Sequence, residues 1–325
     1  MTLRFLLTTF GVAVALSFVA RDAAADRIPR IGFLTSMPPW SAEEGFREGL
    51  RELGYVEGKN ILVEWYRPRE GDQGLQPLAA ELVRRKVDVI VTFRTPPARA
   101  ALSATNTIPV VFLGVADALR SDLVTNLANP GANATGISLL SSELAVKRLD
   151  LLRQLAPRAR RVAYLTNLPN PVTGPQVGDL RTAARALALE LQVFDAGKAG
   201  EGEMDAALHQ IPWKTVDGLQ VGGDAILIPR GEKIAHAVRA AKIPAIFPWR
   251  EYHDYGVIMS YGPNLRDVLH RGAYYVDRLL KGAKPADLPV EQVSTFELII
   301  DLRAAKSMGI SVPKTLLYRA DQVIR

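Results

Sequence analysis

The sequence predicts an α/β fold built as two similar lobes, and three observations lead to this prediction. The chain has 325 residues, which exceeds one ordinary core and suits two lobes of roughly 100–150 residues each. Short apolar runs alternate with amphipathic segments of helical length, a pattern typical of βαβ units and parallel sheets. The order strand, polar residue, Pro-rich turn and helix occurs twice, as IGFLT-SMPP from Ile31 and as VAYLT-NLPNP from Val162. We therefore expect two Rossmann-like lobes with parallel sheets.

The elements of the first half follow from apolar periodicity and from capping residues. Ser41 is a candidate N-cap for a helix that carries Phe46, Leu50 and Leu53 on one face and ends at Gly54. Acidic residues follow the cap, where the helix dipole favours anions. A later helix opens with Thr95 and two prolines in its first turn. The other expected elements are a helix over Gln76–Arg85 and strands over Arg30–Thr35, Ile61–Tyr66, Val87–Phe93, Pro109–Val115 and Ala134–Leu140.

The second half repeats this alternation of helix and strand. The expected helices are Ser142–Leu155, Gln176–Glu190, Glu203–His209, Arg230–Ala241 and Asn264–Leu280. The expected strands are Arg161–Thr166, Gln192–Asp195 and Val216–Val221, and an extended run lies within Pro289–Leu302.

The segment Ala245–Gly262 is the stretch around which we interpret the rest of the chain. Two short apolar runs, Pro244–Phe247 and Val257–Met259, flank a polar loop over Trp249–Gly256. Both runs resemble buried strands that end in polar residues. Ligands of open α/β sheets lie beyond the carboxyl ends of the strands. We therefore expect this segment to supply part of one wall of a ligand cleft and one crossing between the lobes.

The halves do not simply follow one another, because a helix and a long extended run come after Tyr261. This order suits a chain that returns to the first lobe. We expect crossings near Ser138–Ser142, Tyr261–Asn264 and Pro289–Val293. The first lobe would then hold residues 26–140 plus about 263–290, and the second lobe 141–262 plus about 291–325.

The N-terminus has the features of a secretory signal peptide over residues 1–25. Arg4 precedes an apolar run, Phe5–Ala20, and small residues precede Asp26. A membrane anchor is the alternative, but the run is short for a spanning helix. We expect cleavage near Ala25 and a protein located in the periplasm.

Composition narrows the function classes. The chain has no Cys, which excludes disulfides, thiolate catalysis and Cys-type metal sites. The net charge is +6, but charges of both signs are interspersed, and short basic clusters lie beside predicted helix ends, so we expect no nucleic-acid partner. The four His, at 209, 236, 253 and 270, lack metal-ligand spacing. We therefore expect no metal site and no cofactor.

Polar and aromatic residues at predicted strand ends are the candidate ligand-binding site. A small-ligand pocket needs apolar walls and a few hydrogen-bonding groups. Arg94 could pair with an anion through two parallel hydrogen bonds, and Asp117 or Asp224 could bind an ammonium. Each residue alone has an ordinary structural explanation, such as a helix cap, so the joint pattern carries the hypothesis. The candidates are Thr35, Ser36, Trp40, Arg94, Thr95 and Asp117 in the first half, and Asn167, Asn170, Asp224, Trp249, Glu251, Ser260 and Tyr261 in the second.

Eight segments give the chain a resemblance to a known family. They include REGLRELGYVEGKNI from Arg47, IPVVFLGV from Ile108, ANPGANATGISLLS from Ala128, RLDLLRQLAP from Arg148 and KGAKPADLPVEQ from Lys281. Across most of residues 30–325 the chain resembles the substrate-binding proteins of ABC importers with the type I periplasmic-binding-protein fold. The resemblance implies two lobes joined by three hinge segments, a small-molecule ligand trapped between them, and an ABC permease in the inner membrane as partner. It also implies amino acids, including aromatic ones, as ligands of relatives, and we expect a monomer.

Two positions depart from the pattern of that family. Arg94 stands where relatives usually carry a small residue, and Trp249 stands where they usually have Phe. Arg94 favours a carboxylate or another anion as ligand. Two other functions stay open at this point: a ligand-sensing partner of a membrane receptor, and an exported hydrolase, for which no nucleophile–base pair is visible.

Overall fold

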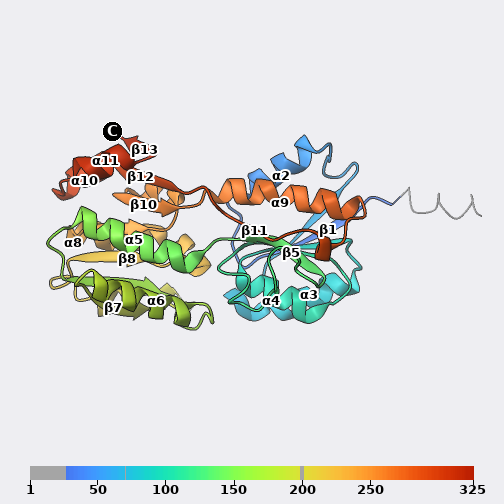
Figure 1. Cartoon of the computed structure of the whole chain (residues 1–325), viewed down its shortest axis with the longest axis horizontal. Coiled ribbons are helices and arrows are strands. Elements are labelled where there is room, and N and C mark those ends of the chain that lie inside the picture. The colour runs from blue at the N-terminus through green and yellow to red at the C-terminus, as the bar shows by residue number, and fades with distance from the viewer. Residues whose placement is uncertain (1–26, 70, 198–200) are drawn as a thin grey trace, which may run out of the picture.

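Two β-sheets form two lobes that lie side by side and are joined by three connections (Figure 1). The computed structural model describes residues 27–69, 71–197 and 201–325. The predicted fold of two α/β lobes with mostly parallel sheets is confirmed. The predicted signal peptide lies outside the described residues.

The first sheet has the strand order β11-β5-β4-β3-β1-β2, and all its pairs are parallel. Helices α2 and α9 pack against each other on one face, and α3 and α4 pack together on the other (Figure 1). The elements are β1 (Arg30–Leu34), α2 (Glu43–Glu52), β2 (Leu62–Tyr66), η1 (Gly71–Gly74), α3 (Leu75–Arg84), β3 (Val89–Phe93), α4 (Thr95–Ala104), β4 (Val110–Val115), β5 (Ala134–Ser138), α9 (Leu265–Leu280), η4 (Pro285–Asp287) and β11 (Glu291–Gln292).

The strands of this sheet are continuous apolar runs because both faces are covered. Along β3, Val89, Val91 and Phe93 pack into the core cluster that α2 and α9 share, while Ile90 packs into the cluster on the α3 and α4 side. Side chains alternate between the faces of a strand, so a sheet covered on both sides needs apolar residues at every position.

The second sheet has the order β13-β12-β10-β9-β8-β6-β7. Helices α5 and α6 pack together on one face, and the right-handed crossover rule places α7 and α8 on the other. The elements are α5 (Ser141–Leu155), β6 (Arg161–Thr166), α6 (Thr173–Ala186), β7 (Glu190–Asp195), α7 (Glu201–Gln210), β8 (Gly218–Val221), η2 (Ala225–Arg230), α8 (Gly231–Ala241), β9 (Ala245–Phe247), η3 (Arg250–Tyr255), β10 (Met259–Gly262), β12 (Glu297–Asp301), α10 (Leu302–Met308), α11 (Lys314–Arg319) and β13 (Gln322–Ile324).

One pair of strands in the second sheet is antiparallel, and the path of the chain explains it. β10 runs toward the first lobe and leads into α9, which packs on the first sheet. The chain returns through β11 and enters the second sheet as β12, which pairs antiparallel with β10. Glu291 and Gln292, which the sequence assigned to the second lobe, pair with β5 of the first sheet. The three connections therefore lie at 139–140, 263–264 and 293–296.

Gly136 makes the pairing of β4 with β5 possible. Its φ is +147°, and a Cβ atom there would lie 1.9 Å from the carbonyl oxygen of Phe112. The register between these strands shifts between Phe112 and Val115. Only a residue without a side chain can approach the neighbouring backbone so closely.

The start of α2 differs from the prediction. Ala42, not Ser41, is the N-cap residue, and no side chain caps the helix. Glu43 is buried and its carboxylate accepts a hydrogen bond from Arg67, at 2.6 Å. Gly54 follows α2 with a φ of +87°, so it ends the helix in the left-handed conformation as predicted.

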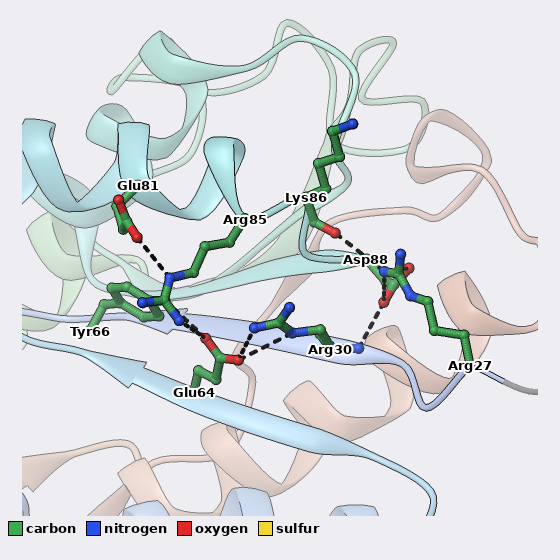
Figure 2. A network of polar contacts seen from close by, with 8 residues as sticks. All are labelled: Arg27, Arg30, Glu64, Tyr66, Glu81, Arg85, Lys86 and Asp88. Atoms are coloured by element: carbon green, nitrogen blue, oxygen red, sulfur yellow. Dashed lines mark hydrogen bonds and ion pairs between the residues drawn. The ribbon is translucent and has the colours of Figure 1, made fainter.

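A polar network fixes the beginning of the described chain to the first sheet (Figure 2). Asp88 accepts hydrogen bonds from Arg27 and from the backbone N–H of Arg30. The Arg30 guanidinium in turn donates to Glu64, which also accepts from Arg85. These residues lie at the amino ends of β1 and β3 and along β2, at the edge opposite the carboxyl ends where the site described next is formed.

Candidate ligand-binding site

A small cavity of about 30 Å³ lies between the two lobes, at the carboxyl ends of the parallel strands. Both lobes contribute to its lining, and most of the lining residues are polar. The residues that line it are Ser36, Asp72, Arg94, Thr95, Pro96, Gly114, Ala116, Ser141, Thr166, Asn170, Val172, Thr173, Gln176, Gly223 and Asp224.

Three helices begin at this cavity. Thr95, Ser141 and Thr173 are the first residues of α4, α5 and α6. Few of the first N–H groups are free, because Ser141 donates to the Ala116 carbonyl oxygen and Thr173 donates to that of Asn170. The prolines in the first turns of α4 and α6 have no N–H. The helix dipoles still favour a negatively charged group. The Thr95 hydroxyl already accepts a hydrogen bond from the backbone N–H of Ala116, at 3.1 Å. Three helices therefore start at one cavity, an arrangement suited to a ligand with a carboxylate.

Arg94 is the cationic residue of the cavity and reaches from the first lobe to the second. Its Nη1 donates to the carbonyl oxygen of Gly223, at 2.9 Å. Its Cζ lies 4.4 Å from the ring centroid of Trp249, a cation–π contact, and 5.3 Å from that of Phe93. Burial lowers the pKa of Arg94, and the nearby Asp224 carboxylate opposes this shift most strongly.

The backbone of Arg94 is strained. Its φ and ψ are 82° and 169°, a region that is essentially restricted to glycine. Strained residues of this kind persist where the surrounding structure holds them, and they are concentrated at functional sites. Arg94 directly precedes α4, so this conformation sets both the start of the helix and the direction of the side chain.

Asp224 is the buried carboxylate on the opposite wall. Its Oδ2 accepts hydrogen bonds from the amides of Asn167 and Asn170, at 3.2 and 2.7 Å. Its Oδ1 accepts from the backbone N–H of Ile226, which makes Asp224 the N-cap of η2. These hydrogen bonds from amide and backbone donors hold the Asp224 carboxylate in place.

Asp72, on the first lobe, is the second acidic residue of the cavity. Burial raises the pKa of its carboxyl, while a hydrogen bond from the Ser36 side chain lowers it in part. Asp224 also raises the pKa of Asp72, because two nearby carboxylates disfavour each other's ionisation.

Five of the thirteen predicted residues line the cavity: Ser36, Arg94, Thr95, Asn170 and Asp224. Two more predicted residues contact lining residues without lining the cavity themselves. Trp249 is buried beneath the Arg94 guanidinium, and Asn167 holds Asp224.

The other six predicted residues lie outside the lining and have local roles. The Thr35 hydroxyl accepts from the backbone N–H of Met37, and the Asp117 carboxylate accepts from two N–H groups of its own turn. Trp40 packs against Phe93, with ring centroids 5.4 Å apart. Glu251 is in η3, and burial raises the pKa of its carboxyl.

Ser260 and Tyr261 are outside the lining because the strand begins later than the sequence indicated. The expected strand was Val257–Met259, with Ser260 and Tyr261 following it, but β10 spans Met259–Gly262. Both residues are therefore inside the sheet. Ser260 pairs with the ring of His253, at 2.9 Å, and the Tyr261 ring packs 6.0 Å from that of Phe296. Ser260 is not beside the cavity, although Thr95 is.

Arg148 is a residue near the site that the sequence analysis missed. It is 2 % exposed and its Nη1 donates to the Tyr261 carbonyl oxygen, at 3.1 Å. Burial lowers its pKa to about 10. A signal was present, because Arg148 falls on the same face of α5 as Leu144 and Leu152, and a cation on an apolar helix face is unusual.

Other missed residues come from segments without a sequence signal. Asp72 lies in η1, and Thr166 ends β6 just before the Asn residues that were predicted. Gln176 lies in α6, accepts a hydrogen bond from the Tyr164 hydroxyl and donates to the Ser141 carbonyl oxygen. Such residues reach the cavity only through the packing of the two lobes.

A second polar contact joins the lobes. Arg120, from the loop after β4, pairs with Asp179 of α6, at 2.7 Å. Both side chains are partly exposed, so the pair adds little to the stability of either lobe. Together with the Arg94–Gly223 hydrogen bond, it links the lobes in this closed arrangement.

Two larger cavities lie outside the space between Arg94 and Asp224. One, of about 310 Å³, borders α9 and the returning hinge segment around Val293–Glu297. Another, of about 620 Å³, lies between α7 and α8 on the second lobe. Neither lies among the converging helix starts, so we assign the ligand site to the cavity between the lobes. Within the described part of the chain, no helix combines the length and apolar character that crossing a bilayer requires.

The chain is similar to curated and structurally solved proteins along most of its length. It is 27 % identical over 285 residues to a tyrosine-binding protein of Clostridioides difficile (strain R20291), covering 86 % of this chain and 81 % of that protein. A conserved domain protein from Vibrio cholerae superposes with a TM-score of 0.84 and 27 % identity, covering 91 % of this chain and all of that one. An ABC domain from Streptococcus pneumonia in complex with L-Trp has a TM-score of 0.83 and 24 % identity, covering 92 % of this chain and all of that one.

A family model described as ABC transporter substrate binding protein matches residues 38–324. The family and the matched relatives are solute-binding proteins and not enzymes, which sets aside the exported hydrolase. The resemblance found in the sequence is thereby confirmed: the chain belongs to the ABC transporter substrate-binding protein family.

Proposed function

We propose that the chain is the extracytoplasmic binding protein of an ABC importer, which traps a small organic solute between its lobes and delivers it to a permease in the inner membrane. The observation that carries this proposal is the cavity lined by residues of both lobes at the start of three helices. A ligand that contacts both lobes favours the closed state by its greater affinity for that state.

The solute we propose is an amino acid or another carboxylate. The buried Arg94 guanidinium at the cavity suits a carboxylate, and Asp224 or Asp72 on the facing walls suits an ammonium. Relatives named as a tyrosine-binding protein and as a complex with L-Trp support an amino acid.

We further propose that the leader directs export, that cleavage occurs near Ala25, and that the mature protein is a periplasmic monomer. The sequence features of residues 1–25 support export. Substrate-binding proteins of ABC transporters act outside the cytoplasm, which agrees with this location.

Thermal unfolding with a panel of amino acids and small organic acids tests solute binding. A solute at 100 times its dissociation constant stabilises the folded state by about 2.7 kcal/mol, so at least one member should raise the unfolding temperature by several degrees. Small-angle scattering with that solute should show the compact, closed arrangement of the lobes.

A pair of Asp variants separates cleft binding from nonspecific effects. Asp224→Ala removes a buried cavity carboxylate and should abolish the ligand-induced shift. Asp287→Ala changes an exposed carboxylate of η4 and should leave the shift unchanged. If no solute shifts the unfolding temperature, or if Asp224→Ala leaves the shift intact, the proposed site is incorrect.

A further inference from the structure

Arg94 lines the cavity, and one edge of its guanidinium has no hydrogen-bond partner among the described residues. Nη1 is bound to the Gly223 carbonyl oxygen, but Nε and Nη2 are buried and form no hydrogen bond with any described residue. No described carboxylate forms an ion pair with it within 4.0 Å. A buried cation with free N–H groups is unfavourable unless an anion pairs with it.

The two free nitrogens are the ones that together can hold a carboxylate. Nε–H and one N–H of Nη2 point from the same edge of the planar guanidinium, so they can donate in parallel to the two oxygens of one carboxylate. The hydrogen bond from Nη1 to Gly223 and the cation–π contact with Trp249 hold this group in place. The free edge is therefore preorganised for a carboxylate.

Arg94 also covers the aromatic surface of the site. The Trp249 side chain is buried, with Arg94 at 4.4 Å from its ring centroid and Tyr252 stacked at 6.2 Å. A Cβ on Gly223 would lie 3.4 Å from the same indole. An aromatic ligand cannot stack on this face of Trp249 while the guanidinium lies over it.

The room left beside Arg94 is small. The cavity measures about 30 Å³, whereas pockets for drug-sized ligands measure roughly 300–1,000 Å³. Even a short carboxylate needs more room than this, so the lobes must separate slightly to admit it. An indole or a phenol ring also needs the Arg94 guanidinium to leave the face of Trp249. The backbone conformation of Arg94, at φ 82° and ψ 169°, is itself costly, so this placement of the side chain is imposed by its surroundings.

We infer that the ligand is a short aliphatic carboxylate whose two oxygens accept hydrogen bonds from Nε and Nη2 of Arg94. We also infer that Arg94 excludes aromatic amino acids. Both statements rest on the proposed solute-binding function. A small amino acid and a small organic acid each carry such a carboxylate. An amino acid would also place its ammonium toward Asp224 or Asp72, and the experiment below separates the two sources.

Titration calorimetry of the purified protein tests the carboxylate. The probes are glycine, L-alanine and L-serine as amino acids, propionate and lactate as organic acids, the amides of L-alanine and lactate as uncharged counterparts, and L-Trp and L-Tyr. We expect at least one short carboxylate to bind, and its amide to bind about thirtyfold more weakly or worse, because a buried charged hydrogen-bond pair is lost. L-Trp and L-Tyr should not bind.

Two variants of Arg94 test its role, and circular dichroism confirms that each one folds. R94K keeps the charge and the strained backbone but loses the parallel pair of donors, so we expect carboxylate binding to weaken about tenfold or more. R94G removes the cation and uncovers Trp249, so we expect it to lose the short carboxylate and to gain binding of L-Trp or L-Tyr.

The outcomes distinguish this inference from the proposed function. Binding of L-Trp or L-Tyr to the wild-type protein, equal binding of a carboxylate and its amide, or wild-type affinity in R94K and R94G would overturn the inference while leaving solute binding intact. If neither the wild type nor R94G binds any member of the panel, the proposed function itself fails.

Discussion

Replacing Arg94 by glycine and by alanine should reveal the backbone strain at the ligand site. Both variants remove the guanidinium and its contacts with Gly223 and Trp249. They differ in whether the backbone can adopt φ 82° and ψ 169° without strain. Glycine adopts this conformation freely, whereas alanine does not.

The magnitude follows from two opposing contributions. The strain of a residue other than glycine in this region is about 1–3 kcal/mol. Glycine loses more freedom on folding, which normally makes the alanine variant more stable by about 0.4–1 kcal/mol. The difference predicts that R94G is more stable than R94A by about 1–2 kcal/mol, which is about 3–6 °C in the unfolding temperature of a lobe of this size.

Equilibrium unfolding in urea, followed by circular dichroism without ligand, measures this difference. The same pair of substitutions at Phe93, inside β3, is the matched control, because alanine should be the more stable variant there. An R94A protein as stable as R94G, or more stable, would show that the backbone at this position is not strained, and the argument for an imposed side-chain position would fail.

Three further predictions concern packing, pH and closure. Gly222→Ala places a Cβ 2.8 Å from the Thr166 hydroxyl, so it should lower the free energy of unfolding of the second lobe by about 1–3 kcal/mol in urea. Gly223→Ala is the control, because its nearest contact is at 3.4 Å, and it should lower the free energy of unfolding clearly less. Equal losses in the two variants would contradict this prediction. Burial lowers the pKa of His253 to about 4 from 6.5, so the unfolded chain binds a proton first as the pH falls, and stability should decrease by up to about 3 kcal/mol between pH 6.5 and 4. His253→Gln should flatten this part of the stability–pH curve, and an unchanged curve would refute the assignment. Asp179→Asn breaks the partly exposed ion pair between the lobes and should weaken ligand affinity by no more than about fivefold. The difference between this variant and the wild type should disappear in high salt. A larger loss of affinity in calorimetry would mean that this pair controls closure.

Much of the fold could be predicted from local pattern. The apolar runs that became β1, β3, β4 and β6 are buried on both faces, so their composition alone marked them as strands. Pro in the first turn of α4 and Gly54 after α2 marked helix ends correctly. The boundaries of β10 were misplaced because Val257 and Ile258 are buried although they precede the strand, so apolar character did not separate them from it.

The sequence by itself determined the two-lobe plan and drew attention to Arg94 and Asp224, because each follows directly or closely on a buried strand whose end must face the cleft. Only the tertiary structure decided that Asp72 and Arg148 lie near them, that Trp249 is covered by Arg94, and that Ser260 is inside a sheet. The physical reason is that strand and helix patterns depend on neighbours along the chain. The site depends on the docking of two lobes, whose contacts join residues far apart in the sequence.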